Sequence, residues 1–301
     1  MGAISSLFGY ILNALYNLFN NYGIAIIIFS ILLRIILIPI TIKQQKTMKK
    51  TTKMQQEMNS IREKYKNDPE KLNQETIELY KRENMSPFSG CLSAILQLVI
   101  ILAVFWLVSQ PLTYMKKVQN SELFNEYKQK IEEQTDTKST YKEIAIIDKV
   151  ESDYQEILNN LNDENVENRE ELENRKNQLE ELRINMEFLG LDLSKVPTQS
   201  LNDWKVYVIP VLYVITSFIS IRLTTKTQNS KNDNEVKSAE TESMEQMNKS
   251  MSYMMPIMSI SIAAIAPLGL ALYWLVSNIL MIFERLIINK FMNSKEGQED
   301  A

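Results

Sequence analysis

The stretch IAIIIFSILLRIILIPITI, residues 24–42, decides the class of fold. Arg34 is its only charged residue. Its length falls within the roughly 17–25 residues that an α-helix needs to cross a hydrocarbon core at about 1.5 Å rise per residue. A helix that is apolar on nearly every side has to be buried. We therefore expect a membrane-spanning helix here.

Four more apolar runs follow along the chain, at residues 92–109, 206–223, 251–266 and 268–288. The last two adjoin at Pro267, and together they far exceed one bilayer crossing. Because Ala266-Pro267-Leu268-Gly269 supplies a turn, we interpret these two runs as a tight helical hairpin. The expected fold class is an all-α integral membrane protein, a bundle of five transmembrane helices.

The charges of the loops predict the topology. Residues 43–86 carry eleven Lys or Arg against seven acidic residues, so the positive-inside rule places this loop in the cytoplasm. Alternation then puts the N-terminus and residues 113–203 outside and the C-terminal tail inside. The outer segment holds twelve basic and twenty-one acidic residues, which agrees with that location. We expect a multi-pass protein of the cell membrane.

The N-terminal residues predict an interfacial helix, because apolar side chains recur there at helical spacing. The segment has neither a basic n-region nor a small-residue cleavage site, so we expect it to be retained. The expected segments are an outer amphipathic helix at 1–20, spans at 21–42, 89–111, 205–223, 251–266 and 268–289, a cytoplasmic helical hairpin at 43–88, an outer segment with a coiled-coil insertion at 112–204, a cytoplasmic loop at 224–250 and a cytoplasmic tail at 290–301.

Two of the loops have helical patterns of their own. In the cytoplasmic loop, Asn67-Asp68-Pro69-Glu70 predicts a capped second helix from Pro69 to about Asn84, antiparallel to a first one. This hairpin either is simply solvated or docks lipid headgroups or a partner. The outer segment is either a solvated stalk or a substrate-binding module. Its apolar stripes are Tyr154, Ile157 and Leu161, and, at heptad spacing, Leu172, Leu179, Leu182, Met186 and Leu189.

Ordinary enzyme chemistry lacks its usual side chains. The chain has one cysteine, Cys91, and no histidine, which excludes an intramolecular disulfide and deprives zinc sites and Ser-His-Asp triads of their usual parts. We expect no catalytic residue, no metal and no cofactor.

Arg34 is the candidate functional residue, because a charge in mid-membrane costs roughly 2.5–3.5 kcal/mol on insertion scales. One interpretation is snorkelling, although Ile42 is about 12 Å of helix away. The other is a water-filled cavity. An internal ion pair is not expected unless Glu284, near the end of a span, reaches Arg34. The candidate polar wall comprises Gln97, Thr216, Ser217, Ser220, Ser277 and Asn278.

Several motifs together resemble the YidC/Oxa insertases, in the compact form found in single-membrane bacteria. Departures are Ser220, where the family often has glutamine, Ser93, where it has proline, a longer outer insertion at about 116–185, and no lipoprotein cysteine. The motifs are YGIAIIIFSILLRIILIPITIKQQK (22–46), EKYKNDPEKLNQE (63–75), ENMSPFSGCLSAILQ (83–97), FLGLDLSKVP (188–197) and PLGLALYWLVSNI (267–279).

The resemblance implies five helices around a hydrophilic groove that is open to the cytoplasm and to lipid and closed to the outside. Arg34 matches the family's groove arginine, and Trp274 matches a position near the groove. The implied function is insertion and chaperoning of membrane proteins without ATP. The implied partners are nascent membrane proteins and lipids, and the Sec translocon, the signal recognition particle pathway and the ribosome through the hairpin; no nucleic-acid site is implied.

Three other functions compete with this one. An anion or solute transporter could use the same arginine, but the chain shows no evident inverted repeats. An intramembrane enzyme would need a nucleophile and base, which no motif supplies. A scaffold or assembly chaperone remains open.

Overall fold

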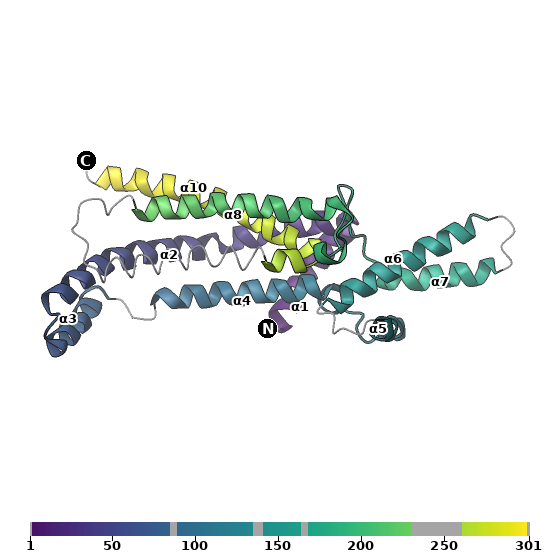
Figure 1. Cartoon of the computed structure of the whole chain (residues 1–301), viewed down its shortest axis with the longest axis horizontal. Helices are drawn as coiled ribbons and strands as arrows, with labels where there is room; N and C mark the ends of the chain where they lie inside the picture. The colour runs from purple at the N-terminus through teal and green to yellow at the C-terminus, as the bar shows by residue number, and fades with distance from the viewer. Residues whose placement is uncertain (1, 85–88, 135–140, 164–167, 230–260, 300–301) are drawn as a thin grey trace.

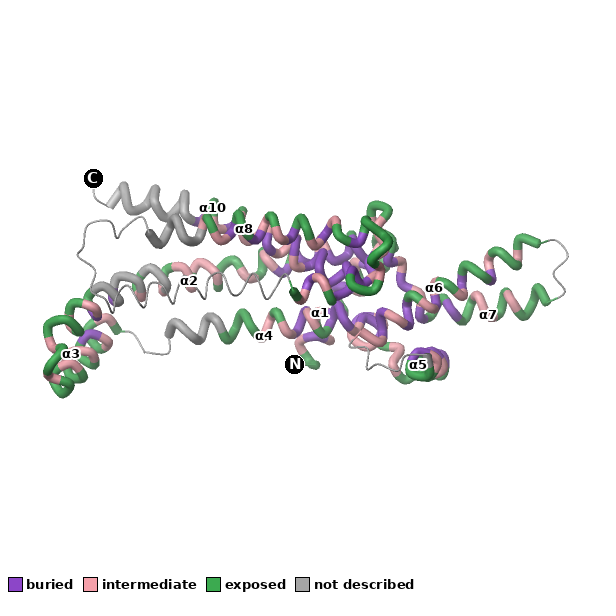
Figure 2. Tube along the Cα trace, in the orientation of Figure 1, coloured by how far each residue is buried: buried purple, intermediate pink, exposed green. Residues whose placement is uncertain are grey.

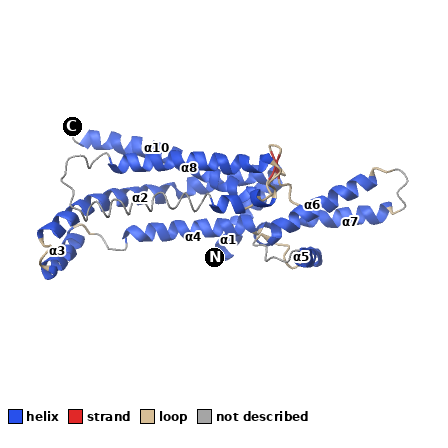
Figure 3. Ribbon diagram, viewed as in Figure 1, coloured by secondary structure: helices blue, strands red, loops and turns tan. Residues whose placement is uncertain are grey.

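The computed structural model describes residues 2–84, 89–134, 141–163, 168–229 and 261–299. Helices make up most of the molecule, and α2, α4, α8 and α10 run along its long axis (Figures 1 and 3). The elements are α1 Gly2–Phe19, α2 Tyr22–Lys64, α3 Pro69–Arg82, α4 Ser89–Ser109, the π-helix η1 Leu112–Lys116, α5 Glu122–Gln134, α6 Lys142–Leu161, α7 Arg169–Leu182, β1 Glu187–Phe188, β2 Leu191–Asp192, the 3-10 helices η2 Pro197–Gln199 and η3 Trp204–Tyr207, α8 Val208–Asn229 and α10 Leu268–Glu299.

Three helices of the described chain are long and apolar enough to cross a membrane: Tyr22–Thr47, Trp204–Leu223 and Leu268–Ile288. They correspond to the first, third and fifth predicted runs. The second run forms α4, whose apolar stretch Ile95–Ser109 is shorter. Of the fourth run, residues 251–260 lie outside the described residues, as do residues 230–250 of the predicted cytoplasmic loop.

The helix does not break at residue 43, between the segments predicted as the first span and the hairpin. A single helix, α2, continues from Tyr22 to Lys64 over 43 residues, with Pro39 inside it. Residues 43–64 contain no glycine or proline and are rich in Lys, Gln and Glu, all good helix formers. Likewise α10 continues through residues 290–299, where a separate tail was predicted.

The α3 helix forms the predicted antiparallel pair with the end of α2. It begins at Pro69, where the Asp68 side chain accepts a hydrogen bond from the Lys71 amide at 3.1 Å, and ends at Arg82, two residues before the predicted Asn84. The apolar contact between the two helices is small, and ion pairs at its edge join Arg82 to Glu57 and Lys50 to Glu83. The buried residues of this contact are Met54, Met58 and Leu79.

The α1 helix buries a face other than its most apolar one. Its buried stripe is Ser5, Gly9, Leu12 and Tyr16, while Leu7, Tyr10, Leu18 and Phe19 are exposed. The Ser5 hydroxyl donates to the Ala103 carbonyl of α4 at 3.0 Å. Small residues let helix backbones approach closely in membrane proteins. The helix packs on α2, α4 and η1, and Phe8, Ile11 and Leu15 of its apolar stripe are partly buried against the core.

The segment predicted to lie outside folds into the packed helices α5, α6 and α7, with Tyr154 and Ile157 of α6 and Leu179 and Leu182 of α7 buried. The predicted heptad pattern is wrong beyond Leu182, where α7 ends. Met186 precedes a two-stranded antiparallel hairpin, β1 with β2, and Leu189 lies in its turn with positive φ and 86% exposure. Gly190, also at positive φ, follows it and makes this turn possible.

Residues 183–196, the seal segment, bind the beginnings of two membrane helices. The Tyr22 amide at the start of α2 donates to the Asn185 carbonyl at 3.0 Å, and the Gly269 amide of α10 donates to the Leu193 carbonyl at 2.9 Å. The first amides of a helix have no partner within it. Because the seal segment supplies those partners, it holds α2 and α10 together at this end.

Burial is uneven along the bundle (Figure 2). Near α6 and α7, a continuous apolar core includes the first turns of α2 and α10 and the last turns of α4. Toward α3 the same helices become exposed: α2 is buried at Phe29 but exposed at Ile36, and α4 is buried at Val104 but exposed at Leu98. Among the described residues, these helices are therefore more buried at the α6/α7 end than toward the α3 end.

Glu143, at the start of α6, is a buried carboxylate outside the spans. It accepts hydrogen bonds from the Thr113 amide at 3.0 Å and the Thr113 hydroxyl at 2.5 Å. Burial raises the pKa of the Glu143 carboxyl, and the hydrogen bonds from Thr113, which favour the charged form, oppose that rise.

We expect Gly9→Ala to lower the free energy of unfolding by about 2 kcal/mol, because the new Cβ would lie 1.9 Å from the Tyr114 carbonyl oxygen. Thermal unfolding of the purified protein in detergent measures the change. Gly2→Ala on the same helix is the matched control, since its Cβ would meet nothing closer than 4.0 Å. Equal unfolding temperatures for both variants would contradict this close packing.

We expect Glu143→Gln to change the pH dependence of stability. Because the pKa of Glu143 is raised in the folded state, the folded protein binds this proton more tightly than the unfolded chain does. The contribution of Glu143 to the free energy of unfolding therefore falls as the pH rises from 4.5, the ordinary pKa of a glutamate, through the pKa of the folded state. The glutamine variant lacks that loss. Its unfolding temperature relative to wild type should therefore rise with pH across this window, and a constant difference would refute the assignment.

Candidate functional site

Arg34 of α2 and Glu284 of α10 form an ion pair inside the bundle. The contact joins Nε of Arg34 to a carboxylate oxygen of Glu284, and the two side chains are 19% and 7% exposed. Arg285, the next residue on α10, is half-buried and close enough to interact electrostatically with both. The three ionised side chains sum to a net charge of +1.

The pair lies deep along the spans. Arg34 is twelve residues beyond Tyr22, or about 18 Å of helix rise, and Glu284 is sixteen residues beyond Leu268, or about 24 Å. Tyr22 and Leu268 both begin their helices beside the seal segment. In a hydrocarbon core about 30 Å thick, the charges are therefore in its half nearer to the α3 end.

A second polar layer joins α10 to α8. The Asn278 amide donates to the Ser217 hydroxyl at 3.0 Å and to the Thr216 hydroxyl at 3.3 Å. Thr216 in turn donates to the Tyr213 carbonyl of its own helix at 3.0 Å. Asn278 and Ser217 are buried, and Asn278 precedes Glu284 by six residues, about 9 Å of helix. This layer fixes α8 against α10 next to the charges.

An aromatic pair flanks the polar layer. The Trp274 ring lies 6.3 Å from the Tyr213 ring, tilted by 36°. Tyr273 on the adjacent position is buried, and its hydroxyl lies near Ser277 and Arg34. The wall beside Arg34 therefore combines hydroxyl and amide groups with aromatic edges.

The structure brings most of the predicted site residues together. Thr216, Ser217 and Asn278 form one hydrogen-bonded group, and Ser220 is buried on the same face of α8. Gln97 is different: its side chain on α4 is exposed and makes no hydrogen bond to the others in the described part of the chain. Tyr273 was not predicted as a site residue, because a tyrosine within an apolar run is usually part of the hydrophobic core.

The sequence left an ion pair of Arg34 open only for the case in which Glu284 reaches it, and the structure shows that case. The sequence places Glu284 near the end of a span and Arg34 near the middle of another, which suggests different depths. In the structure α2 and α10 are in contact with a relative shift that aligns the two side chains. A buried charge is stabilised mainly by a partner charge and hydrogen bonds, which is why this alignment matters.

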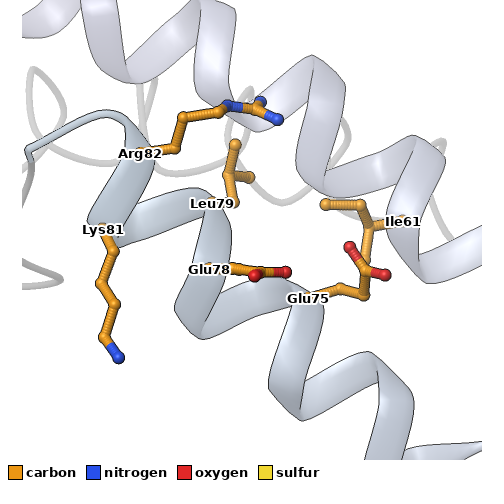
Figure 4. Close-up of a pocket in the computed structure, with 6 residues that line it drawn as sticks. All are labelled: Ile61, Glu75, Glu78, Leu79, Lys81 and Arg82. Atoms are coloured by element: carbon orange, nitrogen blue, oxygen red, sulfur yellow. The ribbon is translucent and has the colours of Figure 1, made fainter.

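The concave pocket shown in Figure 4 lies elsewhere, at the α2/α3 hairpin. Its volume is about 450 Å³, and it is lined by Ile61, Glu75, Glu78, Leu79, Lys81 and Arg82. Figure 4 shows Leu79 and Arg82 on the side facing Ile61 and Lys81 pointing away. Mixed charges around a small apolar floor suit contact with a protein or headgroup surface better than enclosure of a small molecule.

Comparison with known proteins points to one family. The 60Kd inner membrane protein family matches residues 14–296. A membrane protein insertase YidC of Fusobacterium nucleatum is 45% identical over 96 residues, 32% of this chain and 47% of the relative. The insertase YidC of Treponema denticola is 25% identical over 94% of this chain and 37% of the relative. YidC 2 of Listeria innocua is 25% identical over 93% and 68%.

The similarity covers the relatives unequally. The chain spans about half the length of the Fusobacterium protein and 37% of the Treponema protein, whereas it spans 68% of the Listeria protein. The match over almost the whole of this chain includes the polar layer and the Arg34–Glu284 pair.

We expect Asn278→Ala to weaken the contact between α8 and α10 by about 1 kcal/mol, since interhelical hydrogen bonds in membranes contribute about 0.6 kcal/mol each on average. Resistance to unfolding in an SDS titration of the detergent-solubilised protein measures the loss. Asn17→Ala, an exposed asparagine on α1, is the control. An unchanged SDS midpoint for Asn278→Ala would show that the amide does not hold the two helices.

Proposed function

The chain belongs to the 60Kd inner membrane protein family, the family of the YidC and Oxa insertases, and from this membership we propose that it inserts other proteins into the cell membrane and assists their folding. The observation that carries the proposal is a net positive, hydroxyl-lined cluster within otherwise apolar helices. Such a cluster provides hydrogen bonds and charge at a depth where lipid provides neither.

The proposed mechanism lowers the barrier for the polar tail of a client protein. A tail crossing the hydrocarbon core alone would leave its backbone and side chains without partners, at several kcal/mol for each unsatisfied group. Beside α2, α8 and α10, Thr216, Ser217 and Asn278 offer exchangeable hydrogen bonds, and Arg34 attracts carboxylates. Burial of the client's apolar segment in lipid then drives the reaction, so no nucleotide is required.

The direction of insertion follows from the packing gradient. The α6/α7 end of the bundle is closed by the continuous core and by the seal segment. The α3 end is more open, and the basic residues that follow the first span lie at that end. We therefore assign the α3 end to the cytoplasm, from which clients enter, and the α6/α7 end to the outside. This topology requires five spans, with residues 251–266 as the fourth.

The proposed partners are nascent membrane proteins, delivered at the cytoplasmic side. The α2/α3 hairpin, with its pocket of mixed charge, is the surface proposed for the ribosome, the signal recognition particle pathway or the Sec translocon. The helices α5, α6 and α7 share their core with the bundle and are proposed as an outer domain that strengthens the closed end. The transporter alternative is not favoured, since the named relatives are insertases.

The test is insertion of a one-span protein into liposomes that contain only the purified chain, scored by protection of the translocated tail from protease. We expect protection above that of protein-free liposomes. Arg34→Gln should lower the ratio of acidic-tail to neutral-tail insertion about fivefold, because the local charge falls from +1 to zero and a change of about 1 kcal/mol corresponds to that factor.

The control for this variant is Arg222→Gln, which removes an exposed arginine at the far end of α8. Gel filtration in detergent confirms that each variant is folded. Equal losses for acidic and neutral tails would refute the electrostatic role of Arg34, while absence of any protection with the wild-type chain would refute autonomous insertion.

A further inference from the structure

Glu284 is the only buried carboxylate in the described part of the spans. It lies on α10, one residue before Arg285, and its carboxylate contacts Nε of Arg34. A carboxylate in this position competes for the same guanidinium that an acidic client tail would approach. Glu284 therefore affects which client tails can bind at Arg34. This inference rests on the proposed insertase function.

The pair is held by charge more than by hydrogen bonding. Neither carboxylate oxygen of Glu284, nor Nε of Arg34, has a hydrogen-bond partner of good geometry in the described structure. Buried ion pairs are strong when additional hydrogen bonds satisfy their remaining polar atoms, and desolvation offsets much of their attraction when those bonds are missing. The contact is thus a poorly satisfied one that another carboxylate can replace.

The site also stays open to a competing group. In the pair, the Arg34 side chain is 19% exposed and the Glu284 side chain is 7% exposed. Because the positively charged Arg34 side chain keeps this exposure, it can attract a second anion while Glu284 is in place. An incoming carboxylate can therefore approach Arg34 and take the place of Glu284 on its guanidinium.

We propose that Glu284 is the resident counter-ion of Arg34 and a specificity-determining residue: it holds the arginine between clients and is displaced by a carboxylate of an acidic tail. Glu284 then weakens the attraction between Arg34 and acidic tails. Neutral tails pass without displacing Glu284 from Arg34. It also supplies the negative charge that a basic tail would meet at this depth.

The experiment compares three client proteins that differ only in the tail, which is acidic, neutral or basic, using the liposome assay with the full chain. Glu284→Gln removes the competing charge and raises the local charge from +1 to +2. We expect the acidic-to-neutral ratio of insertion rates to rise about fivefold and the basic-to-neutral ratio to fall. A purely structural role for Glu284 would change all three tails in parallel.

Glu284→Asp keeps the charge but draws the carboxylate back by one methylene, so its acidic-to-neutral ratio should lie between those of wild type and Glu284→Gln. This variant keeps the test informative if the glutamine variant does not fold. Glu63→Gln, an exposed carboxylate further along α2, is the matched control and should leave both ratios unchanged.

The outcomes separate this inference from the proposed function. Wild-type insertion with ratios that neither Glu284 variant alters would overturn the counter-ion role and leave the insertase function intact. A lower acidic-to-neutral ratio in Glu284→Gln would also overturn it, because the carboxylate would then be assisting acidic tails. Absence of wild-type insertion for every tail would instead remove the proposed function on which the inference rests.

Discussion

The need to accommodate the guanidinium of Arg34 within an apolar bundle is the constraint on which the rest of the structure depends. A charge at that depth has to find a partner, and α10 provides it by placing Glu284 alongside. For the two side chains to meet, α2 and α10 must be fixed relative to each other. The seal segment does this at one end, through amide contacts to Asn185 and Leu193.

The same arrangement explains why the bundle is asymmetric. At the α6/α7 end, apolar side chains of the spans and of the outer helices form one core, and the α1 helix packs closely through Gly9. Toward the α3 end the same helices become more exposed. The polar layer of Asn278, Ser217 and Thr216 lies between the buried and the exposed parts of the helices. The proposed function uses this asymmetry: a polar tail would enter from the α3 end while the α6/α7 end stays closed.

Charge balance links this packing to the proposed function. A fully neutralised site would not attract acidic tails, and an unpaired arginine would be costly to bury. Glu284 pairs with Arg34, and Arg285 follows it directly on α10. In the proposed function, the stability of the site between clients and its attraction for a client both depend on the Arg34–Glu284 pair.

Much of this protein follows from the sequence by itself. Runs of apolar residues of bilayer length predict membrane helices wherever they occur, because the length and the absence of polar side chains are local properties. The Asp68-Pro69 start of α3 is equally local, since a cap and a first-turn proline act within a few residues. The same reasoning singled out Arg34 and the polar residues of α8 and α10.

Only the tertiary structure decided how these elements meet. The buried face of α1 includes Ser5 and Gly9, because the close backbone approach there depends on a neighbouring segment that hydrophobic periodicity does not describe. The end of α7 at Leu182 depends on the seal segment that follows it. Above all, the Arg34–Glu284 pair depends on the relative shift of two helices far apart in the chain, and such a shift has no local signature in sequence.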